Sequence, residues 1–227
     1  MSSLPTDVRS RFRDSAATLG AALNEDGLCA LERYVAELQL WAPRQNLVAE
    51  ASTETLLNRH LLDSLAATEP IRSRLRGPIR LLDLGSGAGL PGLPLGIGID
   101  AGEIVLVEPR QRRAHFLRAV ARQLPAHPLR VVCARANELP AAHPDLLGNL
   151  DVVVSRATFS DPAEFLKHAS LLLRPGGLAV RWCRLAPPST DAVPGLGFAR
   201  IETHTYELPV RETHRALEIH TKAEGAS

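Results

Sequence analysis

Three glycines at two-residue spacing, Gly85, Gly87 and Gly89, directly follow the largely apolar run Ile79–Leu84. Glycine tolerates positive φ and carries no Cβ, so the backbone can turn sharply there and a ligand can lie against it. The segment that follows is expected to begin a helix, whose unpaired amides can bind a carboxylate. A strand, a glycine-rich turn and a helix in this order predict the first unit of a nucleotide-binding α/β sheet.

From Ile79 onward, short apolar runs alternate with helical patterns, which favours a mostly parallel, doubly wound sheet of seven strands. The expected strands are Ile79–Leu84, Glu103–Glu108, Leu129–Cys133, Asp151–Ser155, Leu178–Cys183 and an antiparallel pair, Phe198–Leu208 and Arg215–Thr221. The clearest helices between them are Arg110–Leu124 and Asp161–Leu173. The segment Arg174-Pro-Gly-Gly177 is expected to form a turn, and Ala186–Pro194 a loop.

The first part of the chain has the apolar spacing of amphipathic helices. Helices are expected over Val8–Leu23, over Leu28–Trp41 with an end before Pro43, and over Glu54–Thr68 with Ser52 or Thr53 as the cap. A basic linker is expected from Pro70 to Pro78. The sequence therefore predicts an N-terminal helical extension over residues 1–70 and a sheet domain over residues 71–227.

The chain of 227 residues has no stretch that approaches the roughly 20 apolar residues of a membrane helix. Its first residues lack the apolar core of a signal peptide. The three cysteines are too scattered for a disulfide framework or a metal site, and Cys133 and Cys183 are expected in buried strands. We therefore expect a cytoplasmic protein without a bound metal, and nothing in the sequence demands a partner chain.

The glycine spacing distinguishes between two classes of cofactor. The dinucleotide fingerprint G-x-G-x-x-G requires glycine where Leu90 stands, and here the third glycine comes one residue early. Asp83, two residues before the first glycine, is typical of methyltransferases. Glu108 lies 19 residues after Gly89, at the end of the second strand, where a carboxylate can accept both ribose hydroxyls. An acid exposed at a strand end is the alternative for Glu108, but together these features predict an S-adenosyl-L-methionine site.

Between Glu108 and Glu138 the chain carries seven arginines and no acidic residue, although its net charge is only +1. A local field of that sign favours a polyanionic partner. A solvated helix face gives the same pattern, so both interpretations stay open on charge alone.

Several motifs together resemble one protein family, the RsmG (GidB) family of bacterial 16S rRNA guanine-N7 methyltransferases. They are Trp41 with Asn46-Leu47, Arg59-His-Leu-Leu-Asp-Ser-Leu65, Gly89-Leu-Pro-Gly-Leu-Pro94, Arg112-Arg-Ala-His-Phe-Leu-Arg118 and Ser155-Arg-Ala157. The chain departs from the family pattern at Val48, at Thr158-Phe159 and at Arg181-Trp182, where Lys-Gly is expected. An arginine does not replace a lysine without consequence, so these departures bear on the identity of the base.

The resemblance implies a Rossmann-like class I methyltransferase fold, S-adenosyl-L-methionine as the cofactor, and 16S rRNA or the small ribosomal subunit as the partner. Together with the glycine loop it places cofactor contacts at Asp83, Gly85, Gly87, Gly89, Leu90, Glu108, Ala136, Asn137 and Arg156. Expected contacts to RNA are Arg59, Arg112, Arg113, Arg118 and Arg181.

Guanine N7 carries a free lone pair, so its methylation needs no general base, and positioning of the two reactants can supply most of the catalysis. Arg156 and Asp63 are the candidate catalytic groups. A carboxylate at Asp63 could stabilise the developing positive charge, or it could be a buried partner of Arg59 or Arg156. His60 is expected to be structural. Two alternatives stay open: a relative of this family that methylates another RNA or a small molecule, and a module that binds the cofactor without turnover.

Overall fold

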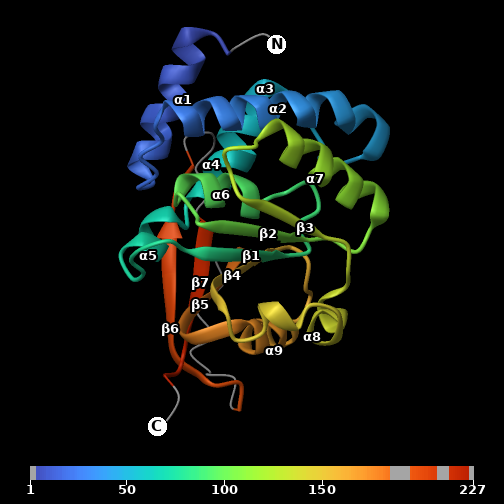
Figure 1. Ribbon diagram of the computed structural model, residues 1–227. Coiled ribbons are helices and arrows are strands. Elements are labelled where there is room, and N and C mark those ends of the chain that lie inside the picture. Colours follow the sequence, from blue (N-terminus) through green and yellow to red (C-terminus); the bar gives the residue numbers. More distant parts are fainter. Residues whose placement is uncertain (1–3, 185–194, 209–214, 225–227) are drawn as a thin grey trace.

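The computed structural model describes residues 4–184, 195–208 and 215–224, and within them seven strands form one sheet in the order β3-β2-β1-β4-β5-β7-β6 (Figure 1). The strands are β1 Arg80–Leu84, β2 Glu103–Val107, β3 Leu129–Val132, β4 Leu150–Arg156, β5 Leu173–Arg184, β6 Phe198–Tyr206 and β7 Arg215–Lys222. The first five are parallel, and β7 runs antiparallel between β5 and β6. The expected doubly wound sheet and its antiparallel pair are confirmed.

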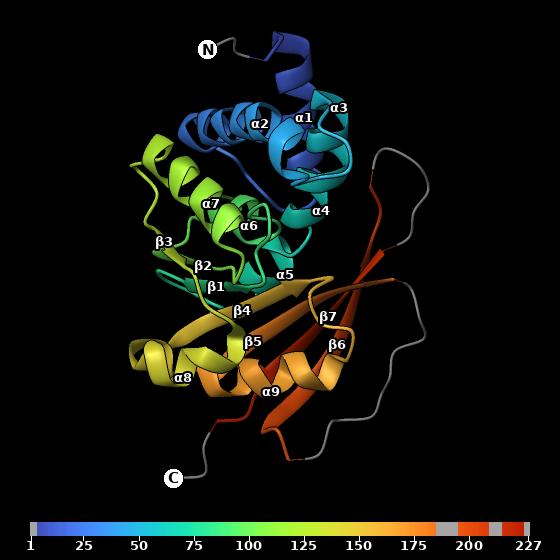
Figure 2. The ribbon, with the colours of Figure 1, turned by 90° about the vertical axis from the view of Figure 1, so that its right-hand side faces the viewer.

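Helices cover both faces of the sheet, with α2, α6 and α7 on one side and α8 and α9 on the other (Figure 2). The helices are α1 Thr6–Thr18, α2 Glu25–Gln45, α3 Thr53–Thr55, α4 Leu62–Leu65, α5 Thr68–Arg72, α6 Gly92–Gly98, α7 Gln111–Gln123, α8 Leu139–Ala142 and α9 Pro162–Leu172. Single turns are η1 Leu56–Leu61, a π-helical turn, and the 3₁₀ turns η2 Ala136–Glu138 and η3 Pro144–Leu146.

The central strands are apolar on both faces because helices bury both. Alternate residues of β1 enter different clusters: Leu81 joins the core under α6 and α7, and Leu82 joins the core above α9. β1 lies between β2 and β4. The chain continues from β1 to β2 and β3 on one side and then returns to β4, which begins the other half of the sheet. The carboxyl ends of β1 and β4 therefore form the switch point where α/β sheets bind ligands.

The N-terminal helices differ from expectation where prolines and glycines act locally. The helix predicted to end before Pro43 continues to Gln45, and Asn46 ends it in the left-handed region at φ 47°. The first helix ends at Thr18 rather than Leu23, ahead of Gly20 at φ 77°. The linker expected from Pro70 is wrong at its start, because α5 continues to Arg72. Pro70 lies in the first turn of this helix, where a missing amide costs nothing.

Other local features also differ. The helix expected over Glu54–Thr68 is interrupted by η1, although Ser52 caps its start as predicted. The turn expected at residues 174–177 is an irregular beginning of β5, whose pairing with β4 jumps from Leu173 to Leu178. Cys133 is exposed and Cys183 half-buried, so their expected burial is wrong. The loop expected at Ala186–Pro194 lies outside the described residues.

Candidate functional site

The glycine loop is held in place mainly by backbone hydrogen bonds. The amides of Gly85 and Ser86 both donate to the carbonyl of Val107, at 2.9 Å each, which fixes the start of the loop to the end of β2. From the other side, the buried hydroxyl of Tyr34 on α2 donates to the carbonyl of Ala88 at 2.7 Å. The sequence did not single out Tyr34, although it falls on the apolar face of its helix, three residues after Leu31.

The three glycines have positive φ of 77°, 58° and 94°, but the space around them differs. A Cβ on Gly85 would collide with Thr158, and one on Gly89 would lie 3.1 Å from Leu117. At Gly87 the nearest side-chain atom is Nη1 of Arg113, at 3.6 Å. The loop is therefore open at Gly87, beneath a guanidinium that the sequence had placed in an RNA contact.

Asp83 lies behind the glycine loop and is fully buried. Its Oδ2 accepts a hydrogen bond from the amide of Gly92 at 2.9 Å, which fixes the beginning of α6, whereas Oδ1 has no partner. Burial raises the pKa of Asp83 to about 7, against the opposing influence of the Gly92 amide and Arg156. This carboxyl group therefore supports the loop from inside the protein.

Glu108 is buried directly after β2, and each of its carboxylate oxygens accepts from a different backbone segment. Its Oε2 accepts from the amide of Gly87 at 2.9 Å, and its Oε1 accepts from the amide of Arg110 at 2.8 Å. Each carboxylate oxygen can accept a further hydrogen bond, so the group fits the two hydroxyls of a ribose.

A pocket of about 300 Å³, here the cofactor-side pocket, opens at the end of β2, where Val107 and Pro109 flank Glu108 in the chain. It is lined by Gly85, Val107, Pro109, Ala134, Arg135, Ala136, Asn137, Thr158, Phe159, Glu164 and His168. The structure thus brings Gly85 together with Ala136 and Asn137, whereas Leu90 is buried in the core. Apolar walls with a few polar groups, next to the glycine loop and an acid, fit the adenosyl half of S-adenosyl-L-methionine.

Asp63 occupies the interior of the other half of the site, with an exposed fraction of 2%. Its Oδ2 accepts from Arg156 at 2.8 Å, and its Oδ1 accepts from the hydroxyl of Tyr206 at 2.5 Å and pairs with Arg215 at 3.3 Å. The indole of Trp182 donates to its carbonyl at 2.8 Å. Asp63 is therefore a buried partner of Arg156, which is one of the two alternatives considered for it.

His60 lies in the same region and is partly buried. Burial first, and then the positive charges of Arg156 and Arg59, lower the pKa of His60 to about 4. The imidazole is therefore neutral at pH 7.

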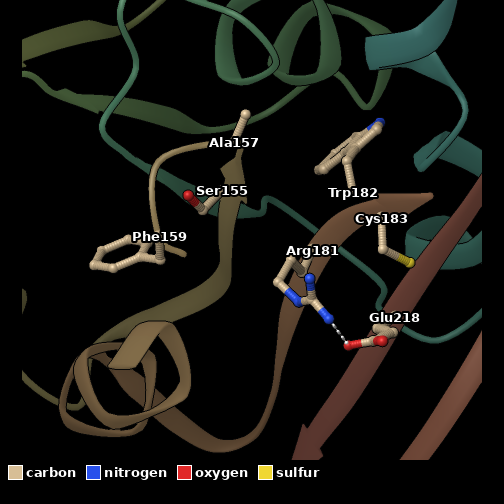
Figure 3. Close-up of a pocket in the computed structure, with 7 residues that line it drawn as sticks. All are labelled: Ser155, Ala157, Phe159, Arg181, Trp182, Cys183 and Glu218. Atoms are coloured by element: carbon tan, nitrogen blue, oxygen red, sulfur yellow. Dashed lines mark hydrogen bonds and ion pairs between the residues drawn. The ribbon is translucent and has the colours of Figure 1, made fainter. Parts of the chain in front are cut away.

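A second pocket, of about 350 Å³, shares Phe159 with the cofactor-side pocket. Figure 3 shows the residues that line it. It is lined by Ser155, Ala157, Phe159, Arg181, Trp182, Cys183 and Glu218, and we call it the β4–β7 pocket. Arg181 forms an ion pair with Glu218 at 2.5 Å. The predicted RNA contact Arg181 is therefore engaged within the sheet.

The remaining predicted RNA contacts lie on helical segments. Arg112 and Arg118 are exposed on α7, and Arg59 is exposed on η1. In the described part of the chain, no group of three or more histidine, cysteine or acidic side chains could hold a metal ion. No described helix is long and apolar enough to cross a membrane.

Comparison with known proteins agrees with this arrangement. A SAM-dependent methyltransferase from Aquifex aeolicus superposes with a TM-score of 0.54 at 14% identity, covering 76% of this chain and 94% of the other. A fibrillarin pre-rRNA processing protein from Methanococcus jannaschii gives 0.52 at 19% identity, covering 71% and 75%. These similarities establish the class I methyltransferase fold.

Sequence relatives are more specific. The Ribosomal RNA small subunit methyltransferase G of Myxococcus xanthus is 32% identical over 93% of this chain and 98% of its own length. That of Bordetella avium is 31% identical over 96% of each chain. Residues 28–182 match the family described as rRNA small subunit methyltransferase G. The chain therefore belongs to the rRNA small subunit methyltransferase G family.

Proposed function

We propose that this chain transfers the methyl group of S-adenosyl-L-methionine to N7 of one guanine in 16S ribosomal RNA. The observation that carries the proposal is the open glycine loop, tied to Glu108 through the Gly87 amide and adjoining the cofactor-side pocket. Membership of a family described by small-subunit rRNA methylation supports the choice of RNA. When bound, the cofactor supplies an electrophilic methyl group.

The side chains bind and orient the two reactants. Glu108 accepts the ribose hydroxyls, and the open loop at Gly87, beneath Arg113, receives the carboxylate of the methionine moiety. No side chain has to remove a proton, because the N7 lone pair is free. Positioning of this kind can supply up to roughly 7–11 kcal/mol. Asp63 acts through Arg156, which it holds at the end of β4.

The exposed arginines Arg112 and Arg118 on α7, with Arg59, bind RNA phosphates. Trp182, one of the departures from the family pattern, has a structural role, because its indole donates a hydrogen bond to the carbonyl of Asp63. Because its substrate is ribosomal RNA, the enzyme works in the cytoplasm. The protein is proposed to act as a monomer, with a division near residue 70 between the helical extension and the methyltransferase domain.

The test uses purified protein, cofactor labelled in its methyl group, and small ribosomal subunits from cells that lack this gene. We expect label in the 16S RNA and, after digestion, in 7-methylguanosine. Binding of the cofactor without any transfer would instead identify a binding module. Label in another nucleoside, or only in other RNAs or metabolites, would refute the proposed substrate.

A further inference from the structure

The proposed function assigns no ligand to the β4–β7 pocket. Phe159 forms a wall that it shares with the cofactor-side pocket, and the ion pair of Arg181 and Glu218 lies across from that wall (Figure 3). Its volume of about 350 Å³ falls within the range of small-molecule sites, roughly 300–1,000 Å³. The pocket is therefore large enough for a nucleobase and shares a wall with the cofactor-side pocket.

We propose that this pocket receives the target guanine, turned out of the RNA, and that Arg181 and Glu218 select guanine through its Watson–Crick edge. The inference rests on the proposed function, and it assigns the substrate site and the residues that determine base specificity. A base stacked in an A-form helix presents N7 in a deep, narrow groove that side chains do not enter. Enzymes that modify bases therefore act on unstacked or extruded bases, held by aromatic stacking and by hydrogen bonds to the Watson–Crick edge.

The hydrogen-bonding groups of the pocket match guanine. Along its Watson–Crick edge guanine presents one acceptor, O6, followed by two donors, N1–H and N2–H. A guanidinium beside a carboxylate presents the complementary order, because arginine only donates and an ionised carboxylate only accepts. Adenine presents a donor at N6 and an acceptor at N1, which would face like groups. The pair of Arg181 and Glu218 therefore favours guanine over adenine.

The carboxylate is held in its accepting form. The nearby imidazole of His220 and the paired guanidinium of Arg181 hold the pKa of Glu218 below its usual range, although burial opposes them. His220 Nε2 lies 3.7 Å from Glu218 Oε2, the same oxygen that Arg181 contacts at 2.5 Å. Glu218 is thus an ionised acceptor fixed on a strand, which is the type of support that precise recognition requires.

The sheet register places the pair close to the glycine loop. Ser155 on β4 is opposite Arg181 on β5, which is opposite Glu218 on β7. The hydroxyl of Ser155 donates to the carbonyl of Leu84 at 3.0 Å, directly before Gly85. N7 and the Watson–Crick groups lie on different edges of guanine. A guanine held by Glu218 therefore keeps its N7 edge free to face the cofactor side.

The experiment combines Glu218→Gln with inosine, which is guanosine without the N2 amino group. Small subunits are reconstituted around 16S RNA that carries guanosine or inosine at the methylated position. For the unchanged enzyme we expect inosine to lower kcat/KM about tenfold, the loss of one hydrogen bond to a charged group. E218Q should lose about tenfold on guanosine, bind the cofactor normally, and show little further loss on inosine.

Glu202→Gln is the matched control, because Glu202 on the neighbouring β6 pairs with Arg74 at 2.7 Å and does not line the pocket. It should discriminate against inosine as the unchanged enzyme does. If the unchanged enzyme is active and E218Q loses as much activity on inosine as the unchanged enzyme does, this inference is overturned and the proposed function is not. An unchanged enzyme that methylates no small-subunit RNA would instead overturn the proposed function. If E218Q does not bind cofactor, Glu218→Asp replaces it, and its inosine penalty must differ from that of the unchanged enzyme.

Discussion

The two halves of the sheet's carboxyl edge are built differently. At β1 and β2, backbone amides of Gly85, Ser86, Gly87 and Gly92 bond to groups within a segment of about 25 residues, from Asp83 to Glu108. At β4, β5 and β7, side chains meet groups far away in the chain, as when Arg156 on β4 contacts Asp63, 93 residues away. The first half can recur in any protein that binds this cofactor. The second half depends on particular side-chain pairs and is the part that can distinguish substrates.

If this comparison holds, changes in the first half should weaken cofactor binding, whereas changes in the second should alter stability or RNA recognition. The largest effect is expected for Asp63→Ala. The substitution leaves Arg156 and Arg215 partly buried without their shared carboxylate, which typically costs about 3–5 kcal/mol. Urea unfolding measures the loss in free energy of unfolding. Asp145→Ala, which breaks a more exposed pair with Arg130, should cost less than about 1 kcal/mol. Equal losses in the two variants would contradict the account.

Glu108→Gln is the corresponding change in the first half. A neutral amide cannot accept from two backbone amides and from the ribose as the carboxylate does. Hydrogen bonds to charged groups contribute about 1.5–3 kcal/mol, so the Kd for S-adenosylhomocysteine should rise roughly 10- to 100-fold. Isothermal titration calorimetry measures this. Glu103→Gln, at the start of β2 and paired with Arg80, should bind as before, and an unaffected E108Q would remove Glu108 from the site.

The arginines of α7 sharpen the comparison within a single helix. Arg112 and Arg118 are exposed, whereas Arg113 reaches the glycine loop at Gly87. The double variant R112Q/R118Q should weaken binding to 16S RNA and reduce the slope of log K against log salt by about 2, with cofactor affinity unchanged. R113Q should weaken cofactor binding and leave RNA binding and its salt dependence unchanged. Filter binding at several salt concentrations checks both, and identical behaviour of the two variants would show that the helix has no such division.

The sequence could group the residues of the first half because the pattern that they form is local. Glycine spacing, Asp83 and Glu108 lie within one β-α-β unit, and the structure places all of them around one loop. Tyr34, Thr158 and Trp182 were not assigned a role, because their partners lie far away in the chain and leave no periodic signal. The same limit explains Asp63, whose partners on β4 and β7 become visible only once the sheet is assembled.

Fold prediction divided along similar lines. The alternation of apolar runs gave every strand, since burial between two helical layers requires such runs. Helix ends were less accurate, because Pro43 is tolerated inside α2 and Pro70 inside α5. Cys133 was expected in a buried strand, yet it follows β3, which is at the edge of the sheet. The boundary near residue 70 stays a prediction.

The smallest change in stability is expected when the pH is varied, because the titrations of Asp83 and His60 change the free energy of unfolding in opposite directions. Asp83 has its pKa raised to about 7, so the folded state binds the proton more strongly and this group lowers stability as pH rises from about 4 to 7. His60, with its pKa lowered to about 4 from 6.5, lowers stability as pH falls from about 6.5 to 4.

Each substitution should therefore expose the slope of the other group. Unfolding of Asp83→Asn between pH 4 and 6.5 should show stability that increases with pH, and His60→Gln should show stability that decreases. Parallel curves for the two variants would contradict the assigned environments.

The most direct test of the central claim maps 7-methylguanosine in 16S RNA from cells that lack this gene and from the same cells with the gene restored. The account predicts that one modified guanine is lost in the deletion strain and returns with the unchanged gene, and to a smaller extent with the E108Q variant. If every 7-methylguanosine of the small-subunit RNA persists after deletion, this chain does not methylate guanine N7 there.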